Sequence, residues 1–329
     1  MLILSASDVR LALPMDQAIK AMKRAFAAFS SGHAEVPLRT RLPVTAHEAT
    51  SLFMPAYLAD EEGETLAVKV VTLFPKNAQL GLPLIHAAVL LLSANTGQPI
   101  ALLEGSTLTA IRTGAASGAA TDLLARSESQ TVAIFGAGVQ ARTQLAAVCT
   151  VRQIQAVWVF DPHREKAEHF KDEMAGQGSI PADLRVAANP DQAIREADIV
   201  CTATTSRTPV FPDQLLKPGA HINAVGSYTP QMQEIPAETV QRARLVVDSR
   251  TAVLAETGDI LLPIQEGKID ASHIHAELGE IVTGRQAGRT DNSQITLFKS
   301  VGLAVQDAAA ARLAVHIARQ SGFGKEVDW

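Results

Sequence analysis

Over the first thirty positions, apolar residues form a short extended run and then recur at helical spacing. Residues 2–4 are all apolar, and the polar residues 5–8 resemble a helix cap before the apolar stretch at 9–13. Between Ala18 and Phe29 the apolar side chains return every three or four residues, which gives one apolar face. The pattern predicts a short strand and two helices, the second packed by that face against other parts of the protein.

From residue 36 the pattern changes to short apolar and β-branched runs separated by turn residues. These runs predict a mostly antiparallel sheet next to the N-terminal helices. The predicted strands cover residues 38–42, 51–54, 66–71, 86–92 and 100–103. Residues 107–124, rich in small side chains, predict a helix that leads into the second half of the chain.

The second half alternates apolar strand patterns with helical ones, which is typical of a parallel, doubly wound sheet. The predicted strands cover residues 131–135, 156–160, 184–186, 198–204, 221–226 and 245–248. Residues 252–290 are predicted to be mixed helix and loop. Residues 295–320, rich in Ala and Val, predict one or two helices after the last element of the sheet.

One strand-to-helix turn in this half has the pattern of a dinucleotide site. Gly136 and Gly138 directly follow the first strand, and Ala141, small like the usual third glycine, lies at the start of a helix. In such a turn a diphosphate lies on the free N–H groups of the helix N-terminus. Asp161 ends the next strand, 25 residues after Gly136, where an acidic side chain would meet the adenosine ribose. The sequence therefore predicts a Rossmann domain; the alternative is the same fold with an empty crevice.

Two cationic residues in the first half need an explanation. Lys69 interrupts a six-residue apolar run, and burying an unpaired ammonium is costly. The alternative for Lys69 is an edge strand on which it faces water. Arg112 lies in the first half of the small-residue helix, where a guanidinium can bind a carboxylate through two hydrogen bonds. The alternative for Arg112 is a salt bridge between domains.

Composition limits the possible classes of protein. A length of 329 residues indicates about two domains, and 47% hydrophobic residues are enough for a buried core. The net charge of −5 without a basic block argues against nucleic acid as a partner. No apolar run reaches membrane-spanning length, and the N-terminus lacks a signal pattern. Cys149 and Cys201 lack metal-ligand spacing, so we expect no metal site and a soluble cytoplasmic protein.

Taken together, the motifs resemble those of the ornithine cyclodeaminase/mu-crystallin family of NAD(P)-dependent enzymes. The likeness spans nearly the whole chain, and several spaced motifs in the right order make it specific. The matching pieces are Arg41, Lys69 within residues 67–71, residues 107–117, residues 136–140, residues 223–226 with Pro230 and Glu234, and residues 297–302.

The resemblance implies an α/β protein with a Rossmann doubly wound sheet and a discontinuous α+β domain. Residues 1–118 and 300–329 would form the substrate-binding and dimerisation domain, and residues 119–299 the NAD(P)-binding domain. It also implies a homodimer through the N-terminal domain, with NAD(H) or NADP(H) as cofactor. Asp161 favours NADH, whereas the adjacent His163 and Arg164 leave use of NADPH open.

The resemblance also implies roles for individual residues. Arg41 and Arg112 would bind the substrate α-carboxylate, and Lys69 would lie beside the reacting carbon and nitrogen as the catalytic residue. A lysine desolvated near two arginines has a lowered pKa, which makes proton donation feasible. The implied cofactor-binding residues are Arg112, Thr113, Gly136, Gly138, Val139, Gln140, Asp161, His163, Arg164, Thr202, Ala224, Val225, Gly226 and Ser227.

Two departures from the cyclodeaminase pattern decide the expected subgroup. Ornithine cyclodeaminases carry Gly-Gly-Asp after the fifth strand, and this chain has Tyr228 at the Asp position. They also have a Glu before Met-Pro in the N-terminal sheet, where this chain has Phe53. Without these carboxylates the distal ammonium of ornithine has no counter-charge. We therefore expect an imine reductase that converts Δ1-pyrroline-2-carboxylate to L-proline, and its six-membered analogue to L-pipecolate, with Tyr228 among the substrate-binding residues.

Three alternatives stay open from the sequence. One is reductive amination of pyruvate, as in the alanine dehydrogenases of the family, and another is true cyclodeamination. The third is a non-catalytic NAD(P)(H)-binding protein, since mu-crystallins also bind a small hormone. Retention of Arg41, Lys69 and Arg112 together argues against the last, because a pure binding protein does not need all three.

Overall fold

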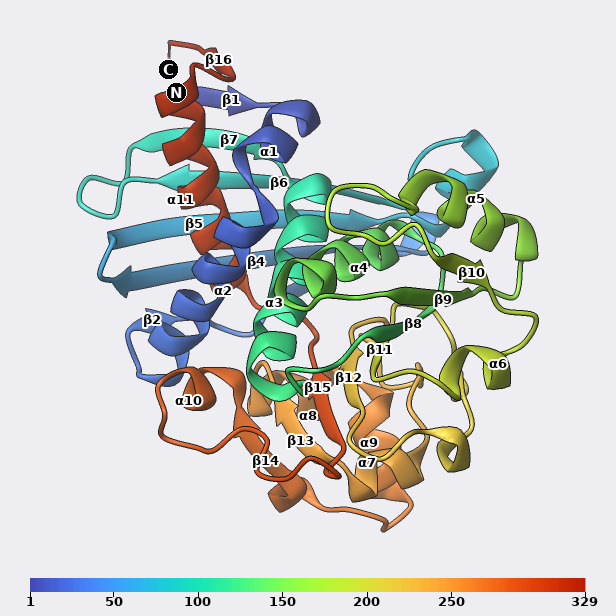
Figure 1. Cartoon of the computed structure of the whole chain (residues 1–329). Coiled ribbons are helices and arrows are strands. Elements are labelled where there is room, and N and C mark those ends of the chain that lie inside the picture. The colour runs from blue at the N-terminus through green and yellow to red at the C-terminus, as the bar shows by residue number, and fades with distance from the viewer. Residues whose placement is uncertain (329) are drawn as a thin grey trace. The chain divides into compact units, whose positions relative to one another are not determined.

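The computed structural model describes residues 1–328, apart from the side chain of Ala78, and divides them into two compact units. Unit 1 comprises residues 1–112 with 303–329, and unit 2 comprises residues 113–302. Helix α3, Gly105–Leu124, begins in unit 1 and continues into unit 2 (Figure 1). Each unit has its own sheet of eight strands, and the two sheets are built on different principles.

Unit 1 is built on a sheet in the order β16-β1-β7-β6-β5-β4-β2, with β3 paired to β4. All pairings are antiparallel except β1 with β7. Its elements are β1 Leu2–Leu4, α1 Ala6–Ala12, α2 Met15–Ser30, β2 Ala34–Glu35, β3 Thr40–Val44, β4 Ala49–Asp60, β5 Gly63–Leu73, β6 Ile85–Leu92, β7 Pro99–Glu104, α11 Ala304–Ser321 and β16 Lys325–Glu326. Ser5 caps α1 as its sequence predicts.

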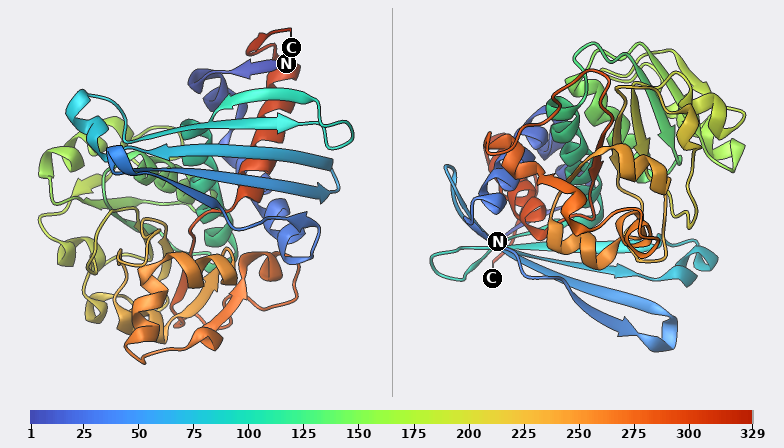
Figure 2. Two further views of the ribbon diagram at one scale, coloured as in Figure 1. Left: turned by 180° about the vertical axis from the view of Figure 1, so that it is seen from behind. Right: turned by 90° about the horizontal axis from the view of Figure 1, so that it is seen from below.

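The two faces of this sheet differ in what covers them. Helix α11 packs on β4, β5 and β6, and α2 packs on β4 and α11. Figure 2, left, shows the central strands lying in front of α11. Residues alternate along β5, so that Ala67, Lys69 and Val71 are buried on the helix-covered side, while Val68 and Val70 belong to the other side. The helix α11 therefore approaches the sheet at the face that carries Lys69.

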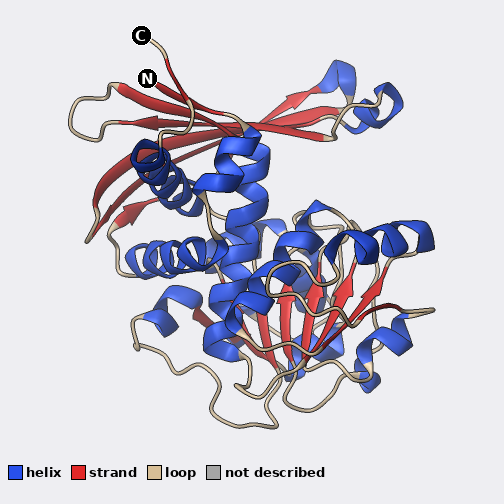
Figure 3. Ribbon diagram, turned by 45° about the horizontal axis from the view of Figure 1, so that its top comes forward, coloured by secondary structure: helices blue, strands red, loops and turns tan. Residues whose placement is uncertain are grey.

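Unit 2 is a parallel sheet in the order β10-β9-β8-β11-β12-β15-β13-β14, with helices on either side of its strands (Figure 3). Its elements are β8 Thr131–Phe135, α4 Val139–Val151, β9 Ala156–Phe160, α5 Arg164–Met174, β10 Leu184–Val186, α6 Pro190–Ile194, β11 Ile199–Thr202, β12 His221–Ala224, α7 Ala237–Arg242, β13 Arg244–Val247, α8 Arg250–Glu256, α9 Gly258–Gln265, β14 Ile274–Glu277, α10 Leu278–Val282 and β15 Thr296–Lys299. The chain order reverses between β8 and β11, which is where such sheets bind ligands. The predicted α/β class with a doubly wound sheet is confirmed.

Two strands of this sheet differ from the sequence prediction. Residues 295–320 predict only helices, but Thr296–Lys299 forms β15 between β12 and β13. Ile274–Glu277 forms β14 within a stretch predicted to be helix and loop. Each of these segments has only four residues and mixes apolar with polar side chains, so it shows no period that separates strand from helix. Here the partners in distant strands decide the conformation.

Candidate functional site

A cavity of about 740 Å³ opens at the carboxyl edge of the parallel sheet in unit 2. It is lined by three segments that follow β8, β9 and β11 and by four further residues. These are residues 135–138, 160–163 and 203–206, with Lys166, Pro190, Pro209 and Val210. The cavity therefore lies at the switch in strand order, where the fold places a dinucleotide.

The glycine turn forms one wall of this cavity. Gly136 has a φ of 93°, and a Cβ there would lie 2.7 Å from the Ala203 carbonyl oxygen, so only glycine fits. Gly138 precedes α4 without a side-chain cap, and a Cβ added to it would meet nothing within 4 Å. Val139 is 68% exposed and Gln140 half-buried in the first turn of α4. The helix N-terminus thus presents backbone N–H groups to open space, as a diphosphate requires.

The segment after β9 lies against the glycine turn and is hydrogen-bonded to it. Asp161 accepts hydrogen bonds from the backbone N–H groups of Ala137 (3.0 Å) and His163 (2.9 Å). Arg164 does not line the cavity; its guanidinium donates to Glu168 at 2.9 Å. Lys166, one turn further along α5, lines the cavity with His163. Lys166 is not among the residues predicted from the sequence, although helical spacing brings it to the same side as His163.

The predicted residues after β11 and β12 are bound to one another through a buried carboxylate. Thr202 donates its hydroxyl to Glu234 at 2.9 Å, and the N–H groups of Gly226 and Ser227 donate to the same oxygen. The Ser227 hydroxyl donates to the Met232 carbonyl oxygen at 2.6 Å. The side chains of Thr202 and Ser227 are therefore engaged inside the protein.

Four further predicted residues occupy different surroundings in unit 2. Ala224 is fully buried at the end of β12, and the Val225 N–H donates to the Thr202 carbonyl oxygen. The Thr113 carbonyl oxygen accepts a hydrogen bond from Gln144 at 3.3 Å. Tyr228 is 38% exposed, which leaves its side chain accessible to a ligand.

A second polar cluster lies in unit 1, between β5, α3 and α11. The Lys69 Nζ forms an ion pair with the Asp307 Oδ2 at 2.7 Å, and the Arg112 Nε donates to the Asp307 Oδ1 at 2.9 Å. The Arg112 Nη1 donates to the Gln306 Oε1 at 3.0 Å. All four side chains are at least 95% buried. Lys69 thus lies on a central strand, and the alternative of a solvent-facing edge lysine is wrong.

Burial and charge act in opposite directions on Lys69. Together these effects lower the pKa of Lys69 to about 7: burial lowers it most, the Asp307 carboxylate opposes this, and the guanidinium groups of Arg112 and Arg39 add to the lowering. Asp307 has no assigned role in the sequence analysis. Its only sequence signal is a carboxylate inside an Ala- and Val-rich helical pattern, where burial demands a cation.

The two arginines of the segment before β4 differ in position. Arg39 is half-buried, and its guanidinium contributes to lowering the pKa of Lys69. It therefore lies within electrostatic range of the cluster. Arg41 is exposed, and its guanidinium lies 3.5 Å from the Thr50 hydroxyl. The structure therefore brings Lys69 and Arg112 together as predicted neighbours and gives Arg41 a different polar contact.

Among residues 1–328, no group of three or more His, Cys, Asp or Glu is arranged to hold a metal ion. Within the same residues, no helix is both long enough and apolar enough to cross a membrane.

The glycine turn, the open cavity at the strand switch and the parallel sheet define a dinucleotide-binding α/β protein. The chain belongs to the ornithine cyclodeaminase/mu-crystallin family, whose sequence model matches residues 1–321.

Relatives within this family are similar over their full length. The chain is 44% identical over 330 aligned positions to a Δ1-pyrroline-2-carboxylate reductase of Bacillus cereus, with 100% of both chains covered. The solved structure of Δ1-pyrroline-2-carboxylate reductase from Thermococcus litoralis, in complex with NADH and L-proline, matches with a TM-score of 0.94. Its sequence identity is 47%, and the match covers 99% of this chain and 100% of that one. An archaeal alanine dehydrogenase dimer with bound NAD matches with a TM-score of 0.92 at 32% identity, covering 100% and 99% of the two chains.

Proposed function

We propose that this chain is an NADH-dependent imine reductase that converts Δ1-pyrroline-2-carboxylate to L-proline. The observation that carries the proposal is its full-length similarity, at 44% and 47% identity, to two reductases of that name. The buried Lys69–Asp307–Arg112 cluster supplies the chemistry that the reaction needs. The six-membered analogue, Δ1-piperideine-2-carboxylate, is a second substrate on the same grounds, because it presents the same imine and carboxylate.

The cavity of unit 2 suits the nucleotide. Gly136 and Gly138 would leave room for a diphosphate at the N-terminus of α4, and Asp161, which lines the same cavity, would bind the adenosine ribose. His163 and Lys166 would approach a 2′-phosphate, so NADPH is a second cofactor. When bound, the reduced nicotinamide supplies a hydride to the imine carbon.

Arg112 is the proposed anchor for the substrate carboxylate. Its Nε and Nη1 are occupied by Asp307 and Gln306, and this fixes the plane of the guanidinium. Its Nη2 has no hydrogen bond within the described residues and is available to a carboxylate. A second arginine would complete the clamp. We favour Arg39 over Arg41 for this role, because Arg39 is half-buried and within electrostatic range of Lys69.

Lys69 is the proposed proton donor. Hydride addition at the imine carbon moves the C=N π electrons onto nitrogen, and the nitrogen takes one proton to give the secondary amine. A lysine with a pKa of about 7 carries a transferable proton at neutral pH. Asp307 keeps the ammonium group in place and favours its charged form. Arg112 shares the same carboxylate, so proton donor and substrate anchor are held in fixed relation.

Tyr228 distinguishes reduction from cyclodeamination. Cyclodeamination needs a base near the amino nitrogen of the substrate, and a neutral phenol is a weak base. Tyr228 can instead offer a hydrogen bond from its partly exposed side chain. We therefore propose Tyr228 as a substrate-side residue and not as a base.

A homodimer through unit 1 is part of the proposal. On the sheet face opposite α11, Leu102, Leu90, Val68 and Pro55 lie in one cross-strand row of directly paired residues. Leu102 is 36% exposed, and such an apolar row is typical of a surface that a second copy covers. The similar alanine dehydrogenase is a dimer in its solved structure. Leu102→Arg should shift the mass measured by light scattering from dimer to monomer, and an unchanged dimer would contradict this interface.

The cytoplasm is the proposed compartment. Cys149 and Cys201 are both free and buried, which fits a reducing environment.

The proposed function is tested by offering NADH with three substrates in turn and following nucleotide absorbance: the five-membered imine, its six-membered analogue, and pyruvate plus ammonia. Δ1-Pyrroline-2-carboxylate should give the highest kcat/KM, with pyruvate plus ammonia at least about a hundredfold lower. Equal or better turnover of pyruvate plus ammonia would assign the chain to alanine dehydrogenation instead.

A further inference from the structure

The carboxylate of Glu234 lies beneath the ends of β11 and β12 and is fully buried. Its Oε1 accepts hydrogen bonds from the Thr204 N–H (2.7 Å) and hydroxyl (2.8 Å). Its Oε2 accepts from the Thr202 hydroxyl (2.9 Å) and from the N–H groups of Gly226 (2.7 Å) and Ser227 (3.2 Å). One side chain thus ties the residues after β11 to the residues after β12.

The buried ion pair of Asp259 and Lys299 lies next to Glu234 and holds its backbone. The Asp259 Oδ1 accepts hydrogen bonds from the N–H groups of Glu234 (2.7 Å) and Ile235 (3.0 Å). The Asp259 Oδ2 forms an ion pair with the Lys299 Nζ at 2.9 Å, and both side chains are fully buried. Burial and the nearby Asp259 raise the pKa of Glu234. The five donors nevertheless fit the ionised form, because three are backbone N–H groups, which can only donate a hydrogen bond.

The packing around this carboxylate leaves no room for an additional carbon atom. A Cβ on Gly226 would lie 2.3 Å from the Thr204 carbonyl oxygen and 2.4 Å from the Glu234 Oε1. A Cβ on Gly258 would lie 2.3 Å from the Met232 carbonyl oxygen, so the segment that carries Glu234 is also held closely. Thr204, the residue bonded twice to Glu234, lines the nucleotide cavity together with its neighbours at 203–206. Glu234 is therefore hydrogen-bonded directly to a residue of the cavity wall.

We propose that Glu234 is a positioning residue for the nicotinamide half of the cofactor. In a doubly wound sheet the two halves each bind one mononucleotide, the adenosine half by β8 and β9 and the other half beyond the strand switch. All five hydrogen bonds to Glu234 come from residues that end or follow β11 and β12, the strands beyond the switch, and none of these five comes from β8 or β9. The inference rests on the proposed use of NADH, and its experiment reads binding and not turnover.

The test compares the affinities of NADH and ADP for Glu234→Gln, measured by calorimetric titration of the full chain. Glutamine keeps the size of the side chain but turns an NH2 group toward N–H donors. We expect the NADH Kd to rise at least about tenfold and the ADP Kd to change less than about twofold. Equal losses for both ligands, or no loss for either, would overturn the proposal.

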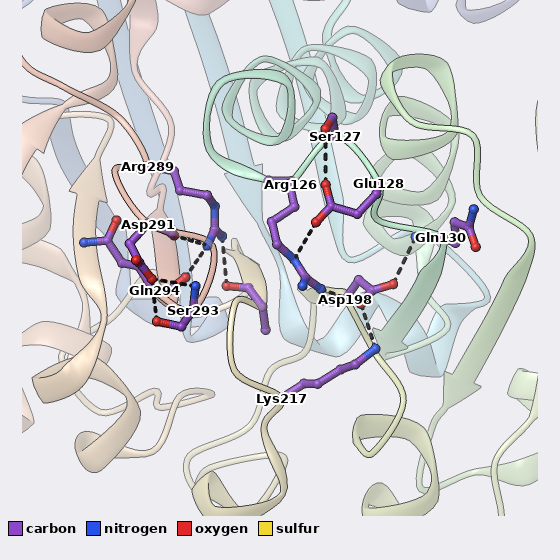
Figure 4. Close-up of polar contacts among 12 residues, drawn as sticks. Arg126, Ser127, Glu128, Gln130, Asp198, Lys217, Arg289, Asp291, Ser293 and Gln294 are labelled. Atoms are coloured by element: carbon purple, nitrogen blue, oxygen red, sulfur yellow. Dashed lines mark hydrogen bonds and ion pairs between the residues drawn. The ribbon is translucent and has the colours of Figure 1, made fainter.

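Asp198→Asn is the matched control. Asp198 lies just before the same strand, β11, at the opposite edge of the sheet. There it binds Arg126 (2.8 Å), Lys217 (2.8 Å) and the Gln130 N–H (3.0 Å), as Figure 4 shows. The Asp198→Asn substitution should lower the melting temperature and leave the ratio of NADH to ADP affinity unchanged. A shift in that ratio as large as that of Glu234→Gln would mean that any weakening of the sheet has this effect, and would overturn the proposal.

Thr202→Val covers the case in which Glu234→Gln does not fold. Thr202 is fully buried, and valine removes only the hydroxyl that donates to Glu234. We expect roughly a twofold to fivefold rise in the NADH Kd with the ADP Kd unchanged, and the absence of that difference would contradict the inference. Wild-type protein that binds ADP but not NADH would refute the proposed function and this inference together. Wild-type protein that binds NADH without reducing the imine would refute the proposed function alone.

Discussion

The two units each bury a lysine against an aspartate, yet the two pairs have different surroundings. In unit 1, Lys69 and Arg112 share Asp307, so two cations surround one anion. In unit 2, Glu234 and Asp259 face a single Lys299, and backbone N–H groups satisfy the remaining anionic oxygens. The first cluster therefore has cationic charge left for an anionic ligand, whereas the second is complete within the protein. A buried lysine alone does not mark a reactive site; the sign of the charge left over around it does.

The largest expected difference between the clusters concerns the lysines themselves. Lys69→Met should lower kcat/KM for Δ1-pyrroline-2-carboxylate by about 10³-fold, because proton transfer by a positioned group contributes about 10²–10⁴-fold. Its NADH Kd should change less than about threefold. Lys299→Met, the matched variant, should act mainly on melting temperature and NADH binding. If Lys69→Met and Lys299→Met both fold, are both saturated with NADH and lose kcat to a similar extent, the two lysines do not differ in their role in the reaction.

Arg112→Ala should give the next largest effect. Loss of a charge-assisted pair to a buried partner costs about 2–5 kcal/mol, which corresponds to a KM for the imino acid raised roughly 30-fold or more. NADH affinity measured by titration should stay within about threefold of wild type. An Arg112→Ala protein with an unchanged KM would remove Arg112 from the carboxylate site.

Arg39 and Arg41 provide a sharper test of position within the same segment. Arg39→Ala should raise the KM for the imino acid about tenfold, through loss of one partly exposed charge-assisted contact. Arg41→Ala should change it less than about threefold, since its guanidinium lies at Thr50. The reverse order of effects in steady-state kinetics would assign the clamp to Arg41, as the sequence motif predicts.

The smallest effect is a displaced pH profile in Asp307→Asn. Lys69 donates a proton only when charged, so wild-type kcat/KM should fall as the pH rises through about 7. The Asp307 carboxylate raises the pKa of Lys69, and its removal should move this fall to lower pH. The substrate ionises in the same way in both assays. A difference between the two pH profiles therefore comes from the ionisation of a group in the enzyme. Coincident profiles would exclude Asp307 as the group that sets the protonation of Lys69.

The sequence predicts unit 2 well, because strand, glycine turn and acidic residue are local signals. Gly136 and Asp161 line the cavity where the pattern places them. The charged partners were not predictable in the same way. Asp307 meets Arg112 across 195 positions of sequence, and only the return of α11 onto the sheet of unit 1 brings them together. The motif containing Glu234 was visible in the sequence, but the five donors around it come from the end of β11 and from the segments that follow β11 and β12.

The difference between Arg39 and Arg41 shows a second limit of the sequence. Both arginines alternate with apolar or small neighbours in one short extended segment, so sequence alone gives them equal standing. Strand β3 begins only at Thr40, and Arg41 pairs in register with Leu52. Arg39 lies before the strand and lowers the pKa of Lys69, and the sequence does not show this difference between the two arginines.

We propose that this chain reduces a cyclic imino acid and does not cyclise a diamino acid. The most direct test follows proline, ammonia and NADH together, first with Δ1-pyrroline-2-carboxylate and then with L-ornithine. We expect one NADH to be oxidised per L-proline formed from the imine, and no ammonia from L-ornithine, because the family resemblance aligns Tyr228 with the carboxylate base of a cyclodeaminase. Proline and ammonia formed from L-ornithine without net change in the nucleotide would contradict it.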